Sequence, residues 1–517
     1  MLIRRPIDRR APGASRLTVP APIGGLNTRD ALDLMPPTDA VRLDNWTPKI
    51  GALAVRAGYL AHAAGIGAGA VETVAEFHAG TVRKLIAAGG GTVYDASSSP
   101  SSLGTGFAAD RWQTVNFNGQ MGLVNGADAP QVFDGASLSA MTISGTGLTP
   151  ANVVGVMAHR SRTYFFEKNS QDFWYSAVDA LGGTLSKFPL SRVGQFGGNL
   201  VCMGSWNVEG GSNVWGGGGI GEDLAVFCMS SGDVVVYRGD DPGSDWSLVG
   251  VFRAGAPVDV RGIARRGSDL LLLTGEGLIS VSRLVGEGSL TASGVVSDKI
   301  RPSLAQAVAD YRANAGWQVL VHSSAALGIV NVPLGGGVFE QYVFNTQTGA
   351  WARWTGIPAA AWGLFADAAY FGDGGGNVCK QAGHTDDGAA IAGDVQTAFT
   401  SLGQRGLLKR CACLRPVFRG KEQASIGIAA QSDFRIAETS PVQVAFGPVT
   451  DTWENAATDW TAWDEHDWEG AAAVAFSEWH AAEGLGYTLG TRLTSSSTDA
   501  LQWETLTYQI ETGQGLF

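Results

Sequence analysis

The chain has few of the residues that carry redox, metal or hydrolytic chemistry. Its 517 residues include five cysteines and seven histidines. The scattered cysteines argue against a disulfide framework and favour a reducing or disulfide-free setting. Cys411 and Cys413 are two apart, so on a strand both are expected on one face. No histidine pair, nucleophile elbow, P-loop or zinc pattern occurs. We therefore expect no enzyme activity, no catalytic residues, no metal and no cofactor.

Long apolar runs are also missing. No stretch approaches the ~18 consecutive apolar residues that a transmembrane helix needs. The first 16 residues carry five arginines, but no apolar segment follows them, so they predict an extended basic arm and not a secretory signal. These arginines are Arg4, Arg5, Arg9, Arg10 and Arg16.

Charged side chains make up only 16% of the sequence, and 36 basic against 48 acidic residues give a net charge of −12. A protein that gripped DNA tightly would need a basic stripe. Outside the arm, basic residues concentrate in one place, where strand spacing predicts exposed positions of a β-sheet. These residues are Arg405, Lys409, Arg410, Arg415, Arg419 and Lys421.

Glycine is abundant: 72 residues, or about 14%, is twice the usual ~7%. Between about residues 70 and 383, an apolar run, a Gly/Asp/Ser turn and a second apolar run recur, which is the signature of a β-hairpin. The copies are Val82–Asp95, Gln120–Asp134, Arg162–Ser176, Asp223–Arg238, Ser268–Arg283, Ala326–Phe344 and Ala368–Gln381.

The hairpins start 38 to 61 residues apart. A period near 40–50 residues with one hairpin per copy is typical of a β-propeller, because a single hairpin cannot bury both its faces and radial stacking covers them. The repeats carry no shared Trp-Asp signature. A large β-sandwich is the competing fold, and the repeat period makes it the weaker alternative.

The remaining segments complete a mainly β fold. Residues 1–60 predict an extended N-terminal arm and an irregular segment interrupted by prolines, in which residues 39–43 make at most a short helical turn. Residues 61–390 predict the β-propeller-like domain, with one helix near 300–315 inside Ser297–Trp317. Residues 391–517 predict an additional C-terminal antiparallel β domain, with strands at Ala424–Ala430, Val442–Phe446 and Leu501–Ile510.

An acidic, tryptophan-rich insertion, 451–479, interrupts the C-terminal domain. Trp453, Trp460, Trp463, Trp468 and Trp479 stand there among eight carboxylates, with no Lys or Arg. Tryptophan supplies large contact area, so docking of a partner protein and stacking on sugars are functional interpretations. Packing between short strands is the structural alternative, and a Ca²⁺ site has little support because no regular loop spacing is present. We take Trp453, Trp460, Trp463, Trp468, Arg4, Arg5, Arg9 and Arg10 as candidate partner-docking residues.

Three segments carry a resemblance to a known family. The first runs from Ile23-Gly24-Gly25-Leu26-Asn27 through Met35-Pro36-Pro37 and Ala40–Trp46 to Arg56-Ala57-Gly58-Tyr59. The second comprises Leu224–Tyr237 and Asp269–Val281, and the third Tyr370–Asp373, Asn377-Val378 and Asp386-Asp387-Gly388. Together they resemble the tail hub or nozzle proteins of podoviruses, the short-tailed bacteriophages, of the type that stabilises packaged DNA. The acidic insertion matches nothing in that family.

The resemblance implies a structural virion protein, made in the host cytoplasm and built into the tail. It implies a hexameric ring that extends the DNA channel, retains packaged DNA and allows its ejection. The implied partners are a head-to-tail adaptor ring, tail fibres, a tail needle or plug, and double-stranded DNA that passes without sequence-specific binding. Independently, six copies would carry a charge of about −72, and an acidic lumen would let a polyanion slide.

Two other functions stay open at this point. One is a receptor-binding propeller that recognises surface glycans through the tryptophan-rich insertion. The other is a propeller enzyme that acts on polysaccharide.

Overall fold

The computed structural model describes residues 14–208, 222–420, 424–439, 441–444 and 474–513. They fall into two compact units. Residues 59–349 and 355–382 form the first, which we call the propeller unit. Residues up to 58, 350–354 and those from 383 onward form the second, which we call the sandwich unit.

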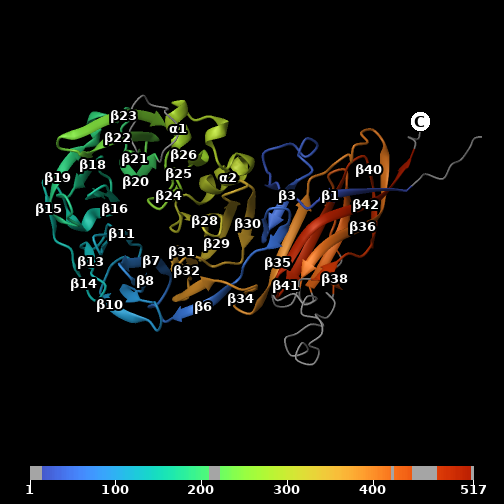
Figure 1. Ribbon diagram of the computed structural model, residues 1–517, viewed down its shortest axis with the longest axis horizontal. Helices are drawn as coiled ribbons and strands as arrows, with labels where there is room; N and C mark the ends of the chain where they lie inside the picture. The colour runs from blue at the N-terminus through green and yellow to red at the C-terminus, as the bar shows by residue number, and fades with distance from the viewer. Residues whose placement is uncertain (1–13, 209–221, 421–423, 440, 445–473, 514–517) are drawn as a thin grey trace, which may run out of the picture. The chain divides into compact units, whose positions relative to one another are not determined.

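The propeller unit contains seven small antiparallel sheets, or blades, arranged around a common centre (Figure 1). The first two contain β7 (Val71–Ala79), β8 (Val82–Gly89), β9 (Thr92–Asp95) and β10 (Ser101–Thr105), then β11 (Gln113–Phe117), β12 (Gln120–Val124), β13 (Gln131–Phe133) and β14 (Leu138–Ala140). The third contains β16 (Val153–His159), β17 (Arg162–Glu167), β18 (Asp172–Tyr175) and β19 (Gly183–Pro189), with β15 (Ile143–Gly145) beside β19. The fourth contains β20 (Leu200–Val208), β21 (Glu222–Met229), β22 (Asp233–Asp241) and β23 (Asp245–Arg253).

The other three blades complete the ring. Blade 5 contains β24 (Ile263–Arg266), β25 (Asp269–Thr274) and β26 (Gly277–Ser280); blade 6 contains β27 (Gln318–His322), β28 (Leu327–Gly335) and β29 (Val338–Asn345). Blade 7 contains β31 (Ala361–Phe365), β32 (Ala368–Gly372) and β33 (Asn377–Gln381), and β6 (Tyr59–Ala64) is its outer strand, antiparallel to β33. The innermost strands contact one another in chain order, and β31 returns to β7. The predicted β-propeller is therefore confirmed, and the described residues form seven blades.

All seven predicted hairpins are confirmed, and each forms the second and third strands of its blade. Neighbouring blades cover both faces of these strands, so their apolar runs are continuous. In β25, the five residues from Leu270 to Thr274 are all buried, as are the four residues from Thr163 to Phe166 in β17. Continuous apolar runs are the pattern expected of strands buried on both faces.

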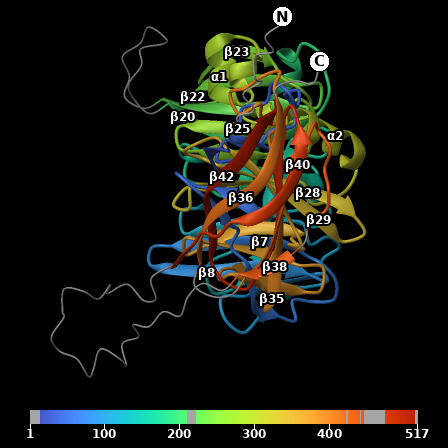
Figure 2. The same ribbon diagram turned by 90° about the vertical axis from the view of Figure 1, so that its right-hand side faces the viewer.

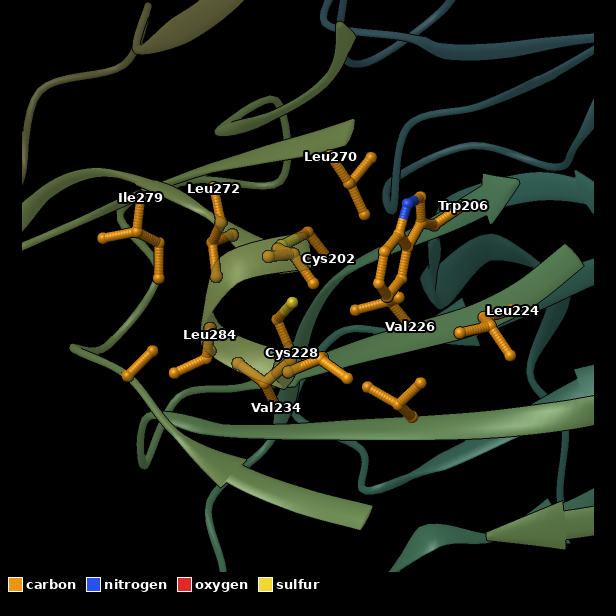
Figure 3. Close-up of a cluster of buried hydrophobic side chains, with 14 of the residues drawn as sticks. Cys202, Trp206, Leu224, Val226, Cys228, Val234, Leu270, Leu272, Ile279 and Leu284 are labelled. Atoms are coloured by element: carbon orange, nitrogen blue, oxygen red, sulfur yellow. The ribbon is translucent and has the colours of Figure 1, made fainter. Parts of the chain in front are cut away.

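Blade 5 leads into a short helix that the sequence analysis did not predict, α1 (Val281–Glu287). The Oγ of Ser280 accepts a hydrogen bond from Arg283 N at 3.3 Å, which caps the helix start, and Gly288 ends it with φ 73°. The buried face of α1 contributes Leu284 to a core with side chains of blades 4 and 5 (Figure 3). Blade 5 has three strands in the described residues, and the apolar face of α1 covers core side chains that a fourth strand covers in other blades.

The predicted helix is α2 (Arg301–Tyr311), which follows the 3-10 turn Asp298–Ile300. It contacts β26 and β28 of the propeller. Further 3-10 turns lie at Pro150–Asn152, Leu190–Arg192 and Ala292–Gly294. Of the helices that the structure describes, none is both long and apolar enough to cross a membrane.

The described part of the sandwich unit forms two sheets. The first contains β39 (Val474–Phe476), β36 (Leu408–Gly420), β42 (Leu501–Gly513), β5 (Leu53–Val55) and β4 (Trp46–Pro48), with β1 (Ser15–Pro20) on β42 and β40 (His480–Gly486) on β36. The second contains β2 (Gly25–Leu26), β3 (Asp39–Asp44), β35 (Ala389–Thr397), β41 (Leu489–Ser497), β37 (Ala424–Ser432) and β38 (Pro441–Val444), together with β30 (Trp351–Thr355) and β34 (Thr385–Asp386). The hydroxyls of buried Tyr508 and Thr491 join the two sheets at 2.8 Å.

Two predictions about this unit are wrong. Residues 39–44 form strand β3 and not a helical turn, because β2 and β35 flank this segment and pair with its backbone. The irregular segment predicted within residues 1–60 also contains the strands β1, β2, β4 and β5. Of these, β1 and β5 pair with β42 near the other end of the sequence, which no local pattern indicates. Cys411 and Cys413 do not share a face: a bulge between them places Cys411 opposite Ile510, fully buried, and Cys413 opposite Gln509, partly exposed.

Candidate functional site

The eight predicted docking residues lie outside the described residues. They are Arg4, Arg5, Arg9, Arg10, Trp453, Trp460, Trp463 and Trp468. The described residues adjoining these segments meet on the first sheet of the sandwich unit, where the guanidinium groups of Arg16 and Arg415 lie 5.4 and 5.9 Å from the centre of the half-exposed Trp479 ring. Such cation–π contacts favour a fixed orientation of the ring.

The basic residues near 405–421 are mostly exposed, as predicted, with one exception. Lys409 is buried, and its Nζ donates hydrogen bonds to the carbonyls of Leu407 at 2.9 Å and Tyr487 at 2.8 Å. Burial lowers the pKa of Lys409. The alternation of inward and outward positions along β36 predicts that Lys409 points inward. The prediction that all the basic residues of this run are exposed did not apply the alternation. Lys421 lies outside the described residues.

The centre of the propeller is bridged by an arginine. Arg261, which precedes β24, donates from Nη1 to the Glu72 carbonyl at 2.8 Å and from Nη2 to the Trp112 carbonyl at 2.6 Å and the Thr73 hydroxyl at 3.1 Å. The donor belongs to the start of blade 5 and the acceptors belong to blades 1 and 2. Arg261 therefore spans the ring.

A second arginine makes the opposite connection. Arg111, just before blade 2, donates from Nη2 to Asp259 Oδ1 and to the Trp317 carbonyl, both at 2.9 Å. Asp259 Oδ1 also accepts from the backbone N–H of Arg261 at 3.0 Å. Burial away from water, followed by the neighbouring charge of Arg111, lowers the pKa of Arg261 to about 9, so Arg261 is charged at neutral pH.

A cavity of about 250 Å³ adjoins this network, and all seven innermost strands line it. Its polar lining includes Gln113, Thr114, Gln318 and Arg261. Gln113 Nε2 has no hydrogen-bond partner in the part of the chain that the structure describes. A polar cavity of this size has room for ordered water. It has no room for duplex DNA, whose major groove alone is ~12 Å wide.

Sequence patterns gave no sign of this bridge. Arg261 and the Glu72 carbonyl are 189 residues apart in the chain, and neither arginine belongs to a basic run. Only the closed ring brings the loops before blades 2, 5 and 6 together. No group of three or more His, Cys, Asp and Glu side chains among the described residues is arranged to hold a metal.

The first segment of the family resemblance forms a buried polar network within the sandwich unit. Buried Asn27 donates from Nδ2 to buried Asp39 Oδ2 at 2.8 Å and to Asp30 Oδ2 at 2.9 Å. Gly25 has φ 86°, and a Cβ placed there would lie 2.6 Å from the backbone of Trp351. Glycine at this position therefore permits both the turn and the close approach.

The end of the same segment holds a buried arginine. Arg56 donates from Nε to Asn45 Oδ1 at 2.9 Å and from Nη1 and Nη2 to the Asp386 carboxylate at 2.8 and 2.6 Å. Asn45, with φ 60°, also donates from Nδ2 to the Ala392 carbonyl at 2.8 Å. Residues of the first and third segments of the resemblance are thus bonded to each other.

Asp44 and Trp46 extend this contact set. Asp44 accepts a bidentate pair of hydrogen bonds from Arg353 at 2.7 and 2.8 Å, which holds β30 in the sandwich unit. Trp46 is fully buried and donates from Nε1 to Ser495 Oγ at 3.2 Å. We call Asn27, Asp39, Asp44, Asn45, Trp46, Arg56, Arg353 and Asp386 the N-terminal lock.

Comparisons with known proteins identify no relative by sequence: no family model and no curated protein matches the chain. Among solved structures, similarity is found to Sqt1 of Saccharomyces cerevisiae, at 13% identity and TM-score 0.37, covering 66% of this chain and 96% of that one. YCF48 of Cyanidioschyzon merolae gives 11% identity and TM-score 0.34, covering 63% and 96%. The ring of seven blades itself defines the class: the chain is a β-propeller protein with an added β-sandwich.

Proposed function

We propose that the chain is a structural subunit of a short bacteriophage tail, a nozzle or hub protein that assembles as a hexameric ring. The observation that carries the proposal is the N-terminal lock. Six of its eight residues, Asn27, Asp44, Asn45, Trp46, Arg56 and Asp386, belong to the first and third segments by which the sequence resembles podovirus tail proteins. This part of the resemblance therefore falls on side chains that build a domain and not on scattered surface positions.

The bridged propeller centre limits where DNA could pass in such a ring. Arg261, Arg111 and Asp259 cross the ring, and the adjoining cavity holds about 250 Å³. DNA would therefore pass between copies of the chain and not through the propeller of any one copy. A ring of six copies, each with a charge of −12, would surround the duplex with acidic surface, which disfavours tight binding. The basic arm, with Arg4, Arg5, Arg9 and Arg10, would attach each subunit to the adaptor ring.

Electron cryo-microscopy of the purified full chain and of the particle that contains it tests the proposal. We expect six-fold class averages with an axial hole between subunits. A variant lacking residues 1–16 should still form rings but should attach less well to the particle.

A solution monomer without axial symmetry in the particle would overturn the ring assignment. A glycan array then becomes decisive for the receptor-binding alternative. Binding to an array that is lost on Trp460→Ala and Trp463→Ala would identify a glycan receptor protein in place of a conduit.

A further inference from the structure

One end of the sandwich unit carries a group of exposed apolar side chains. At this end β36 begins, while β40 and β42 finish: Lys409 pairs with Gly486 of β40 and with Thr512 of β42, and the three strands lie side by side (Figure 2). The group is 39–60% exposed and comes from three segments: the residue before β36, the turn after β37, and the end of β40 with the turn that follows it. We call it the apolar tip; its members are Leu407, Phe434, Ile436, Leu485 and Tyr487.

Two polar side chains, those of Lys409 and Asp433, connect these three segments through hydrogen bonds to the backbone. Lys409 Nζ binds the carbonyls of Leu407 and Tyr487 at 2.9 and 2.8 Å. Asp433 Oδ1 accepts hydrogen bonds from the backbone N–H groups of Tyr487 at 2.8 Å and Thr488 at 3.0 Å. Because the ammonium and the carboxylate are both engaged by the backbone, the apolar side chains are presented in a fixed arrangement.

The turn that carries Phe434 has an unfavourable backbone for its sequence. Asp433 and Phe434 have φ 46° and 65°, and Arg435 N donates to the Ser432 carbonyl at 3.0 Å, so these two residues form the centre of a tight turn. Such turns favour Asn-Gly, and a left-handed phenylalanine is uncommon. Phe434 nevertheless stays 42% exposed, with one edge against Phe399. An outlier of this kind points to a use for the side chain.

Positive charge flanks the tip. Arg405 and Arg435 are exposed, and neither forms an ion pair with any residue in the described ranges. The carboxylate of Asp433, two residues before Arg435, already accepts the two backbone N–H groups, and that of Glu438 pairs with Arg492. Exposed Leu, Phe and Ile side chains beside unpaired arginines match a bilayer surface with anionic headgroups. Tyr487, half-exposed and amphipathic, suits the headgroup level.

We propose that the apolar tip inserts into the surface of a lipid bilayer that contains anionic lipids. The apolar side chains stand on three separate segments of the chain and not on one strand face, which favours a deformable lipid surface over a complementary protein face. This proposal goes beyond the proposed tail function and would stand if ring assembly failed.

Vesicle co-sedimentation of the full chain tests it, with phosphatidylcholine vesicles and with vesicles that also contain phosphatidylserine. We expect binding to the anionic vesicles that decreases at high salt. Phe434→Gly relieves the left-handed strain, so it should fold at least as well as the parent chain. Combined with Leu407→Ser and Ile436→Ser, it should weaken binding tenfold or more. Arg405→Ala with Arg435→Ala should remove the preference for anionic lipid.

Ile50→Ser is the matched control, because Ile50 is 79% exposed in the turn between β4 and β5, away from the tip. It should bind like the parent chain. Absence of parent-chain binding to both vesicles, or equal binding by the triple variant, would overturn the proposal. Self-association that the tip variants abolish, without vesicle binding, would also overturn it and would assign the tip to a second copy of the chain.

Discussion

At the scale of single residues, Arg261 connects parts of the propeller that are far apart in sequence. Its guanidinium satisfies two buried backbone carbonyls and one hydroxyl on blades 1 and 2. Removing this cation leaves the Glu72 and Trp112 carbonyls without their guanidinium donor, so the position has a large effect on stability.

We predict that Arg261→Met destabilises the folded chain by about 3–5 kcal/mol. Arg265→Met in the same blade should change stability by no more than about 0.5 kcal/mol, because Arg265 is exposed and bonds only to a neighbouring carbonyl. Urea unfolding followed by tryptophan fluorescence measures both. Equal midpoints for the two variants would contradict a bridging role.

His159 gives the propeller a dependence on pH. It is buried, with Nδ1 at 2.9 Å from Ser205 Oγ, and burial lowers its pKa below the usual 6.5. Below pH 6.5 the unfolded chain therefore takes up a proton before the folded chain does. Stability should fall on acidification from pH 6.5, by at most about 1.4 kcal/mol per pH unit.

Unfolding curves at pH 7.5 and 5.5 check this. In His159→Gln, the free energy of unfolding should decrease less between pH 7.5 and 5.5 than in the parent chain. In His78→Gln, where the replaced histidine is exposed, the decrease should equal that of the parent chain. If His159→Gln loses as much stability on acidification as the parent chain, the acid sensitivity comes from other groups.

At the scale of elements, the sequence predicted what is local and missed what is formed by distant pairing. The seven hairpins were predictable because each turn and both its strands lie within about 20 residues. Strand β3 was not, because β30 and β35, two of the strands that pair with it, lie more than 300 residues away, as Arg42–Asp394 illustrates with a separation of 352. Arg261 and the apolar tip were missed for the same reason: no local pattern shows which side chains a closed ring or three converging segments bring together.

The N-terminal lock depends on one of two adjacent carboxylates. Asp386 binds Arg56, which is 1% exposed, whereas neighbouring Asp387 is exposed. Asp386→Asn should destabilise the sandwich unit by about 3–5 kcal/mol, because it leaves a buried guanidinium without its counter-charge.

Asp387→Asn should be close to neutral, since asparagine tolerates its φ of 48°. Thermal unfolding of both variants decides the matter. The same midpoint in both would show that the ion pair contributes no stability.

At the scale of the whole molecule, closure of the ring depends on β6, which precedes blade 1 in sequence and pairs in blade 7. Ala63 of this strand is buried in a core with residues of blades 1 and 7, whereas Leu60 is 47% exposed. Ala63→Asp places an unpaired charge in that core and should open the ring.

We expect Ala63→Asp to lower the unfolding midpoint strongly, and to increase hydrogen exchange in blades 1 and 7 before the other blades. Leu60→Asp, three residues away, should leave exchange unchanged. Increased exchange confined to blade 4 in Ala63→Asp would contradict the closure role of β6.

The pairing of β1 with β42 has a consequence for how a cell makes this protein. Thr18 and Thr507 share a hydrogen bond across 489 residues. At ~5–20 residues per second, a ribosome needs on the order of half a minute or more to supply the second strand after the first. The propeller can close once residue 382 has emerged, while the first strand of the sandwich waits as an unpaired edge. Chaperones that shield residues 15–58 during that interval should therefore raise the yield of native protein. Translation pauses that lengthen the interval should lower it.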